Sequence, residues 1–188
     1  MLEMEHGVGV RDAITAFWDT FCRDGSREAE IAEALAIAGL SESDFCEQSQ
    51  TKEDLISAFL KDRHASWMRW FESEIEARYE AIGGGLEIIA DVLREGFEDW
   101  KCFGLAFIHI VMENDDFDNK PFAIIKEQKE LLRRCIEQLA IKMGLQQPGM
   151  VASAAVLVIE QTIVRTLMTG SLNEAQTARI LFQCLQHA

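Results

Sequence analysis

The stretch from Glu30 to Leu55 constrains the fold of this chain more than any other. Its first part places apolar side chains at the i, i+3, i+4 and i+7 positions, which favours one face of a short helix. Gly39 follows as a residue that can take the positive φ of a helix end, and Ser41 can cap the next helix. Thr51 and Asp54 have the spacing of a capping box at the start of a third helix. The stretch therefore predicts two short helices, a tight turn and a longer supporting helix.

The composition favours a globular all-α protein. The 188 residues suffice for a core in one or two small domains. The chain is 48% apolar and 27% charged, and it has only two prolines and one tyrosine. We expect no signal peptide, and the longest near-apolar run, residues 150–159, is too short to cross a bilayer. These features predict a soluble cytoplasmic protein whose five scattered cysteines are reduced and packed as small apolar groups.

The charge balance argues against strong attraction to nucleic acid. The formal net charge is −14, and residues 1–63 alone hold 14 acidic and 6 basic side chains, a balance of −8. Because phosphates repel carboxylates, steering of this chain toward DNA should be poor unless its basic residues gather locally.

Apolar periodicity and glycine breaks predict nine helices and no strand. The first helix covers residues 11–23, and the helix-turn-helix stretch follows to residue 50. Gly83-Gly84-Gly85 is the clearest break after the long helix, and Pro121 suits the first turn of a later helix. The helices expected after residue 50 are 51–82, 86–100, 102–112, 121–143, 150–168 and about 173–186. In the helix 121–143 both Leu131 and Leu132 are expected to face inward, and Ser171 or Asn173 is expected to cap the last helix.

The N-terminal segment resembles the DNA-binding domain of TetR-family transcriptional regulators. Phe21 to Gly25 matches the family's first motif, and Gly25 lies 14 positions before Gly39, as the family usually shows. Ala38-Gly39-Leu40-Ser41 is similar to its A-G-V-S motif, and Thr51-Lys52-Glu53-Asp54-Leu55 is similar to its S-K-E-D-L motif. No gap is needed between Phe21 and Leu55.

This resemblance implies a nine-helix TetR-like homodimer. Residues 1–50 would form a three-helix helix-turn-helix domain, and residues 51–188 a six-helix domain for effector binding and dimerisation, with the helix 51–82 shared. The implied function is a regulator, favoured as a repressor, that binds double-stranded operator DNA and is released by a small apolar effector. The implied DNA contacts are Arg27, Ser41, Ser43, Gln48 and Lys52.

The helix that would read DNA departs from the family pattern. Glu42, Asp44 and Glu47 are carboxylates in a segment where groove-binding helices usually offer basic or small polar groups. Cys46 and Ser49 stand where the family usually has aromatic residues. A second hypothesis therefore stays open, in which the same fold has lost DNA binding and serves as a ligand- or protein-binding module.

Aromatic residues concentrate in the second half of the chain, where they suit an apolar effector pocket with a few polar groups to orient the ligand. For any single aromatic residue, packing in the core is the more common role. Glu160 lies in an otherwise apolar helix and needs a partner, so an ion pair at an interface and a ligand contact are both open. The residues expected to line the pocket are Trp67, Trp70, Phe71, Trp100, Phe103, Phe107, His109, Met112 and Glu160.

The helix expected over residues 150–168 is apolar almost all round, so both of its sides should be covered. With the last helix it could form half of a four-helix dimer bundle, as the resemblance implies; a buried helix in a monomer is the alternative. The residues expected at the dimer interface are Val151, Ala155, Val158, Ile159, Ile163, Ala178, Leu181 and Leu185.

Metal and catalytic chemistry find little support in the sequence. His109 and Glu113 lie at i and i+4 on one helix face, but no third ligand follows at a regular spacing. The sequence has no G-x-S-x-G or H-E-x-x-H motif, and the glycines 83–85 lack the strand and lysine of a phosphate loop. We therefore expect neither an enzyme nor a cofactor.

Overall fold

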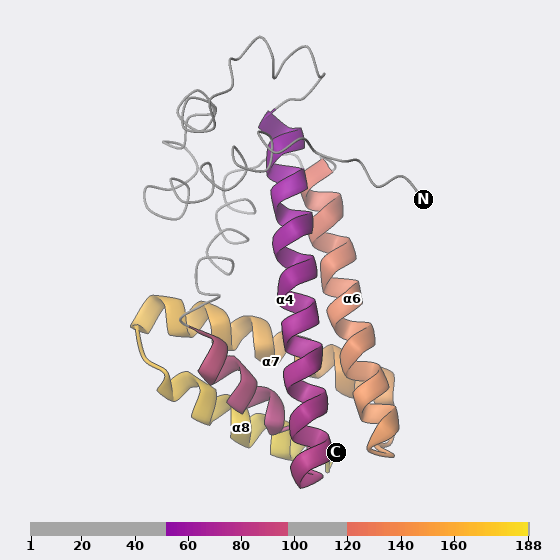
Figure 1. Ribbon diagram of the computed structural model, residues 1–188. Helices are drawn as coiled ribbons and strands as arrows, with labels where there is room; N and C mark the ends of the chain where they lie inside the picture. Colours follow the sequence, from indigo (N-terminus) through magenta and orange to yellow (C-terminus); the bar gives the residue numbers. More distant parts are fainter. Residues whose placement is uncertain (1–51, 98–119, 188) are drawn as a thin grey trace. The chain divides into compact units, whose positions relative to one another are not determined.

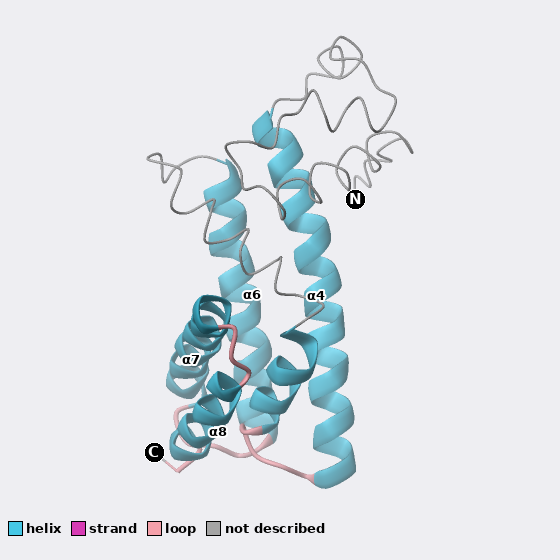
Figure 2. Ribbon diagram, turned by 90° about the vertical axis from the view of Figure 1, so that its left-hand side faces the viewer, coloured by secondary structure: helices cyan, strands magenta, loops and turns pink. Residues whose placement is uncertain are grey.

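The computed structural model describes residues 52–97 and 120–187 of the 188-residue chain. Within these ranges the chain forms five helices and no strand, which confirms the predicted all-α class for this part (Figures 1 and 2). The helices predicted before residue 50 and over residues 102–112 lie outside the described residues.

The helices after residue 50 lie close to where the sequence places them. They are α4 (Lys52–Ile82), a helix at residues 88–97, α6 (Lys120–Lys142), α7 (Pro148–Thr169) and α8 (Asn173–Leu185). Residues 83–85 are non-helical, as the three glycines predict. Pro121 is the second residue of α6, where its missing N–H breaks no helical hydrogen bond.

Contacts divide the chain into two compact units. The first holds Met1–Arg63 and Ala106–Ile125, and the second holds His64–Leu105 and Lys126–Ala188. The helices α4 and α6 each continue from one unit into the other without a break.

The core of the second unit is made of large apolar side chains from all five helices. Each of these side chains is less than 2% exposed, and burial of one contributes roughly 1.5 to 3 kcal/mol. Trp67 and Phe71 add a stacked aromatic pair on α4, with ring centroids 4.8 Å apart. The most deeply buried side chains of this unit are Phe71, Leu86, Ile88, Ile89, Val92, Ile136, Ile159 and Phe182.

The helix at residues 88–97 lies between α4 and α8 (Figures 1 and 2). On the α4 side, the ring of Trp70 covers Gly96 so closely that a Cβ atom there would come within 2.1 Å of it. On the α8 side, Gln186 accepts a hydrogen bond of 3.0 Å from the backbone N–H of Leu86, and Arg179 pairs with Asp91 at 2.6 Å. Position 96 therefore needs glycine, because a side chain there would overlap the ring of Trp70.

The ends of α7 show how glycine and its neighbours set the helix boundaries. Gly170 takes φ 65° at the C-terminal cap, and its N–H donates to the carbonyl oxygen of Thr166 at 2.9 Å. At the other end Gln147 has φ 48°, an unusual left-handed conformation for a residue with a side chain.

Two sequence predictions need correction. Leu131 was expected to face inward on α6, but it is 42% exposed, because α6 turns the neighbouring Leu132 to the core instead. The predicted caps of α8 were Ser171 or Asn173, whereas the residue at the cap is Leu172. The Ser171 hydroxyl, one residue before this cap, still accepts a hydrogen bond of 3.3 Å from the backbone N–H of Asn173.

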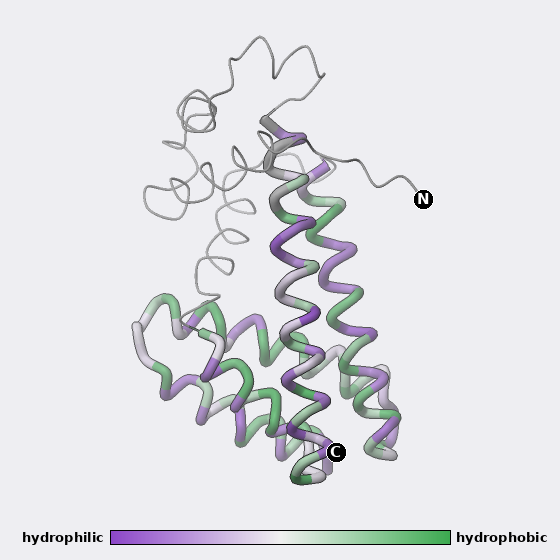
Figure 3. The backbone as a smooth tube through the Cα atoms, viewed as in Figure 1, coloured by the Kyte–Doolittle hydropathy of each residue, from purple (hydrophilic) through white to green (hydrophobic). Residues whose placement is uncertain are grey.

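Apolar residues run along both α7 and α8 (Figure 3). Among the described residues α7 is the one helix long and apolar enough to cross a membrane by length and composition, and 39% of its most apolar window is buried. This is weak evidence for a span, because a core helix of a soluble protein can have the same composition.

Candidate functional site

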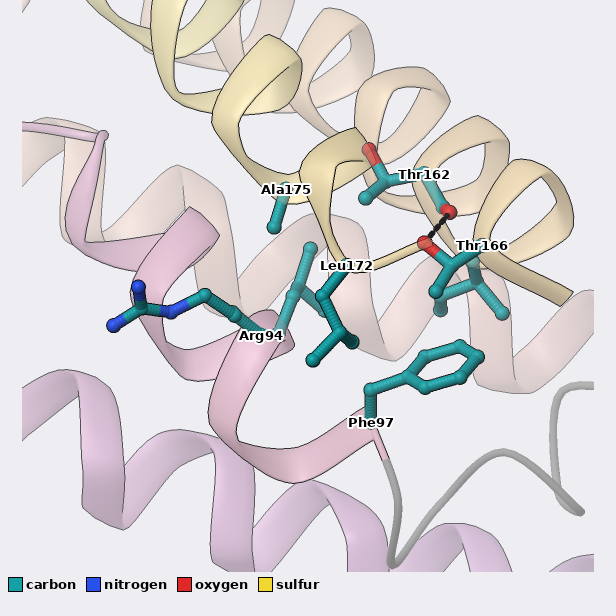
Figure 4. Close-up of a pocket in the computed structure, with 8 residues that line it drawn as sticks. Arg94, Phe97, Thr162, Thr166, Leu172 and Ala175 are labelled. Atoms are coloured by element: carbon teal, nitrogen blue, oxygen red, sulfur yellow. Dashed lines mark hydrogen bonds between the residues drawn. The ribbon is translucent and has the colours of Figure 1, made fainter. Parts of the chain in front are cut away.

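A small cavity lies in the second unit between the helix at residues 88–97, α7 and the start of α8 (Figure 4). Its volume is about 10 Å³, which is room for a body the size of a water molecule. Any larger ligand would have to widen it. The lining residues are Leu93, Arg94, Phe97, Thr162, Ile163, Thr166, Leu172 and Ala175.

Two threonine hydroxyls give this apolar cavity its hydrogen-bonding character. Thr162 donates to the backbone oxygen of Val158 at 2.6 Å, and Thr166 donates to that of Thr162 at 2.8 Å. With each hydrogen committed to the helix backbone, the oxygen lone pairs remain to accept a hydrogen bond. In Figure 4 the Phe97 ring lies below the two threonines, and the Arg94 guanidinium points away from them. The site therefore suits an apolar group that carries a donor.

Of the residues that the sequence predicts for the effector pocket, the four that the structure describes, Trp67, Trp70, Phe71 and Glu160, do not line this cavity. Trp67 and Phe71 are buried in the core, and Trp70 covers Gly96. Sequence reasoning missed the threonines, although two hydroxyl residues at i and i+4 in an apolar helix are a readable signal. The other predicted pocket residues, Trp100, Phe103, Phe107, His109 and Met112, lie outside the described residues.

Glu160 has a partner within the chain. Its carboxylate pairs with the ammonium of Lys129 on α6 at 2.9 Å. The other charge of α7, Arg165, pairs with Glu174 of α8 at 2.7 Å, and this contact raises the pKa of Arg165 and lowers that of Glu174. Both charges of the apolar helix thus connect it to a neighbouring helix of the same chain.

His64 is a buried polar residue next to the same part of α6. Its side chain is 7% exposed, and burial lowers the pKa of His64 to about 4. A hydrogen bond with the backbone of Gln128 opposes this shift, and the charge of Lys129 adds to it. The imidazole is therefore neutral at physiological pH and fixes α4 against α6.

The residues predicted for a dimer interface fall into two groups. Val151, Ala155, Ile159 and Ala178 are at most 7% exposed, so they pack within the chain's own core. Val158, Ile163 and Leu185 are half-buried, and Leu181 is 46% exposed. An interface with a second copy stays a prediction, and the buried four have little surface to offer it.

The outer face of α7 carries a separate apolar stripe. Met150 and Leu157 are both 68% exposed and Met168 is 81% exposed. These residues lie seven and eleven positions apart, which places them on one side of the helix, opposite Ala152, Ala155 and Ile159. On α8, Ile180 and Leu181 are exposed at 55% and 46%. Exposed apolar residues in such a row are typical of a surface that another protein covers.

No group of histidine, cysteine, aspartate and glutamate in the described ranges could hold a metal ion. The predicted pair His109 and Glu113 lies outside those ranges. Cys135 is half-buried, and burial together with Glu72 raises the pKa of its thiol to about 12, so it is protonated at physiological pH.

No protein-family model and no curated protein matches the sequence. Solved structures match the fold. A TetR transcription regulator from Haloarcula marismortui has a TM-score of 0.74 at 16% identity, over 95% of this chain and 96% of that chain. A TetR-family transcriptional regulator from Syntrophomonas wolfei matches with a TM-score of 0.72 at 13% sequence identity. The match covers 96% of this chain and 95% of that chain. A TetR transcriptional regulator from Streptomyces avermitilis matches with a TM-score of 0.67 at 18% sequence identity. The match covers 94% of this chain and 99% of that chain.

This chain has the fold of TetR-family transcriptional regulators. In this fold α4 begins with the motif Lys52-Glu53-Asp54, the last part of the sequence stretch that resembled the family. Of the predicted DNA contacts, Lys52 is the first residue of α4, whereas Arg27, Ser41, Ser43 and Gln48 lie outside the described residues.

Proposed function

We propose that this chain is a transcriptional regulator that binds operator DNA as a homodimer and is released by a small apolar effector. The observation that carries the proposal is the TetR fold, which extends over 94% to 96% of the chain in three solved regulators. In this proposal Ser41, Ser43 and Gln48 read the DNA groove, while Lys52 and Arg27 contact phosphate.

The route from effector to DNA would run along α4 and α6. Both helices are continuous from the second unit into the first. A shift of either helix in one unit would therefore also move the part of that helix that belongs to the other unit. Release then requires that the effector binds one arrangement of these helices better than the other, since a ligand with equal affinity for both shifts nothing.

The effector is proposed to enter the second unit near the small cavity. Its apolar wall and the hydroxyl oxygens of Thr162 and Thr166 would favour a compact apolar molecule with a hydrogen-bond donor. Because the cavity holds only about 10 Å³, entry has to push the helix at residues 88–97 away from α7 or α8. The effector would then bind the displaced arrangement better than the original one, as release from DNA requires.

A second function is favoured by the charge of the chain. The net charge of −14 and the carboxylates Glu42, Asp44 and Glu47 oppose a phosphate backbone. A module of the same fold that binds a ligand or a protein without binding DNA fits these charges better.

A mobility-shift assay with DNA from upstream of the protein's own gene separates the two functions. The regulator should bind such DNA tightly and lose affinity steeply as salt rises, because each phosphate contact releases counterions. Absence of a shift even at low salt would support the module. Glu42→Lys with Asp44→Thr should raise non-specific DNA affinity, whereas Glu127→Lys, a charge change of the same sign at an exposed residue of α6, should raise it much less. No gain from the first pair would mean that residues 42–44 do not face DNA.

A further inference from the structure

The small cavity has three walls, which the chain holds with unequal strength. One wall comes from the helix at residues 88–97 and one from α7. The third wall consists of Leu172 and Ala175, where α7 passes into α8. Leu172 belongs to residues 170–172, which we call the α7–α8 turn. Figure 4 shows the Leu172 side chain among those of Arg94, Phe97 and Thr166, so this side chain closes one side of the cavity.

The first two walls are held by buried side chains. In the helix at residues 88–97, Ile88, Ile89 and Val92 are at most 1% exposed. The helix α7 buries seven of its residues. Either helix would have to break these contacts to move as a whole, and close packing makes such a movement costly.

The α7–α8 turn is held more loosely. None of residues 169–174 is buried, and Leu172 is 42% exposed. The hydrogen bonds around the turn are local: the Thr169 hydroxyl accepts from the N–H of Ser171 at 3.2 Å, and the Ser171 hydroxyl accepts from the N–H of Asn173 at 3.3 Å. Segments with few buried contacts and exposed hydrogen bonds open at a low free-energy cost.

An ion pair connects the two helices on either side of this turn. The guanidinium of Arg165 on α7 donates to both carboxylate oxygens of Glu174 on α8, at 2.7 and 3.3 Å. Arg165 is 56% exposed, so the pair adds little to the stability of the whole fold. A small contribution still matters for a motion that itself costs little, such as the opening of the turn between the two helices.

We propose that the α7–α8 turn is the wall that opens to admit a small ligand to the cavity, and that the Arg165–Glu174 ion pair sets how often it opens. Leu172 is the side chain that blocks the way in. Displacement of the helix at residues 88–97 then makes room for a ligand that has entered. The inference rests on the proposed function only for the identity of that ligand as an effector. The opening is a property of the chain that can be measured without effector or DNA.

A thiol placed inside the cavity reports the opening. In the full-length chain, Thr166→Cys puts a thiol at a position that is 3% exposed, and Thr162→Cys is a second reporter of the same cavity. Methyl methanethiosulfonate, a small apolar reagent, can modify the buried thiol only when the cavity opens. Mass spectrometry of the peptide that holds the reporter gives the rate. The half-buried Cys135 of α6 is the internal reference, because global unfolding would expose both thiols.

We expect variants of the turn to speed labelling of the Thr166→Cys reporter relative to Cys135. Glu174→Gln should speed it by about three- to fivefold, since it breaks an exposed ion pair. Leu172→Ala should speed it by at least about fivefold, since it removes the blocking side chain. The charge swap Arg165→Glu with Glu174→Arg should return the rate to within about twofold of the reporter alone.

The chain provides a matched control for each substitution. Glu160→Gln breaks the other ion pair of α7, the one with Lys129, by the same chemical change as Glu174→Gln. Leu131→Ala shortens a leucine of α6 that is as exposed as Leu172. Neither control should change the relative rate by more than about twofold, because neither residue holds the turn.

The inference is overturned if Glu174→Gln and Leu172→Ala leave the relative rate unchanged, or if Glu160→Gln raises it as much as Glu174→Gln does. It is also overturned if Asp91→Asn, which releases the helix at residues 88–97 from Arg179 of α8, speeds labelling more than Glu174→Gln, because that helix would then be the wall that opens. A chain that binds neither DNA nor an effector would refute the proposed function instead, and the labelling rates would decide the opening by themselves.

Discussion

His64 is a residue whose protonation the fold opposes. Burial and the charge of Lys129 lower its pKa from an ordinary value of 6.5 to about 4. Between these two pH values the unfolded chain binds a proton that the folded chain does not. The free energy of unfolding therefore falls as the pH drops from 6.5 to about 4, and the contribution is fully regained above pH 6.5.

Replacement of His64 by glutamine should remove this pH dependence. Between pH 7 and pH 4.5 we expect the wild type to lose roughly 2 kcal/mol more than His64→Gln. Urea unfolding at the two pH values measures the difference. The exposed His187 supplies the control, because His187→Gln should behave as the wild type does. Equal losses in the wild type and His64→Gln would show that another group carries the dependence.

Gly96 should resist even the smallest side chain. In an exposed helix, Gly→Ala stabilises by up to about 1 kcal/mol. At Gly96 the new Cβ atom would lie 2.1 Å from the Trp70 ring, so we expect Gly96→Ala to destabilise instead, by roughly 1 to 3 kcal/mol. Thermal or urea unfolding measures the sign. The double variant Gly96→Ala with Trp70→Leu should regain part of the loss, and a stabilised Gly96→Ala would contradict the close contact.

Single residues are where the sequence predicted least. Periodicity placed both Leu131 and Leu132 inward, but adjacent side chains point about 100° apart around a helix, and here only Leu132 is buried. The buried His64 and Gln128 were not predicted, because their burial depends on which helix packs against them. Likewise, nothing in the sequence alone pairs Glu160 with Lys129, which lie on different helices.

Whole elements were predictable because their ends carry strong local signals. The glycines at 83–85, 144 and 170 stop three helices, and prolines lie in the first turns of α6 and α7. These residues restrict the backbone whatever packs around them. The cap of α8 was predicted at the wrong residue, Ser171 or Asn173 in place of Leu172, since the reach of the Ser171 hydroxyl to the N–H of Asn173 depends on the turn that follows Gly170.

The start of α7 contains a backbone strain that a substitution can relieve. Gln147 is the one residue other than glycine with positive φ in the described ranges, and its side chain caps nothing. We expect Gln147→Gly to raise the free energy of unfolding by roughly 0.5 to 1 kcal/mol, because glycine takes this conformation without a Cβ penalty. The adjacent Gln146→Gly is the control and should give no gain. Equal effects of the two variants in urea unfolding would refute the strain.

At the scale of the whole molecule, the motifs from Phe21 to Leu55 led to the correct fold although identity with the three solved regulators is only 13% to 18%. The use of α7 was harder to predict, because a helix that is apolar all round does not reveal which side faces outward. The structure assigns Ala155 and Ile159 to the core and exposes Met150, Leu157 and Met168. A surface contact can be predicted only once the inner face is known.

The exposed stripe of α7 makes the proposed homodimer testable. Leu157 is 68% exposed, and a charge there would have to be buried if a second copy covers this face. We expect Leu157→Glu to weaken self-association by at least roughly tenfold, measured as mass by light scattering across a dilution series. Leu131→Glu places the same charge at a leucine of α6 that is 42% exposed, and it should leave the dimer intact while showing that the fold tolerates such a change. A wild-type chain that is monomeric throughout the series, or a Leu157→Glu variant as dimeric as the wild type, would remove this face from the interface.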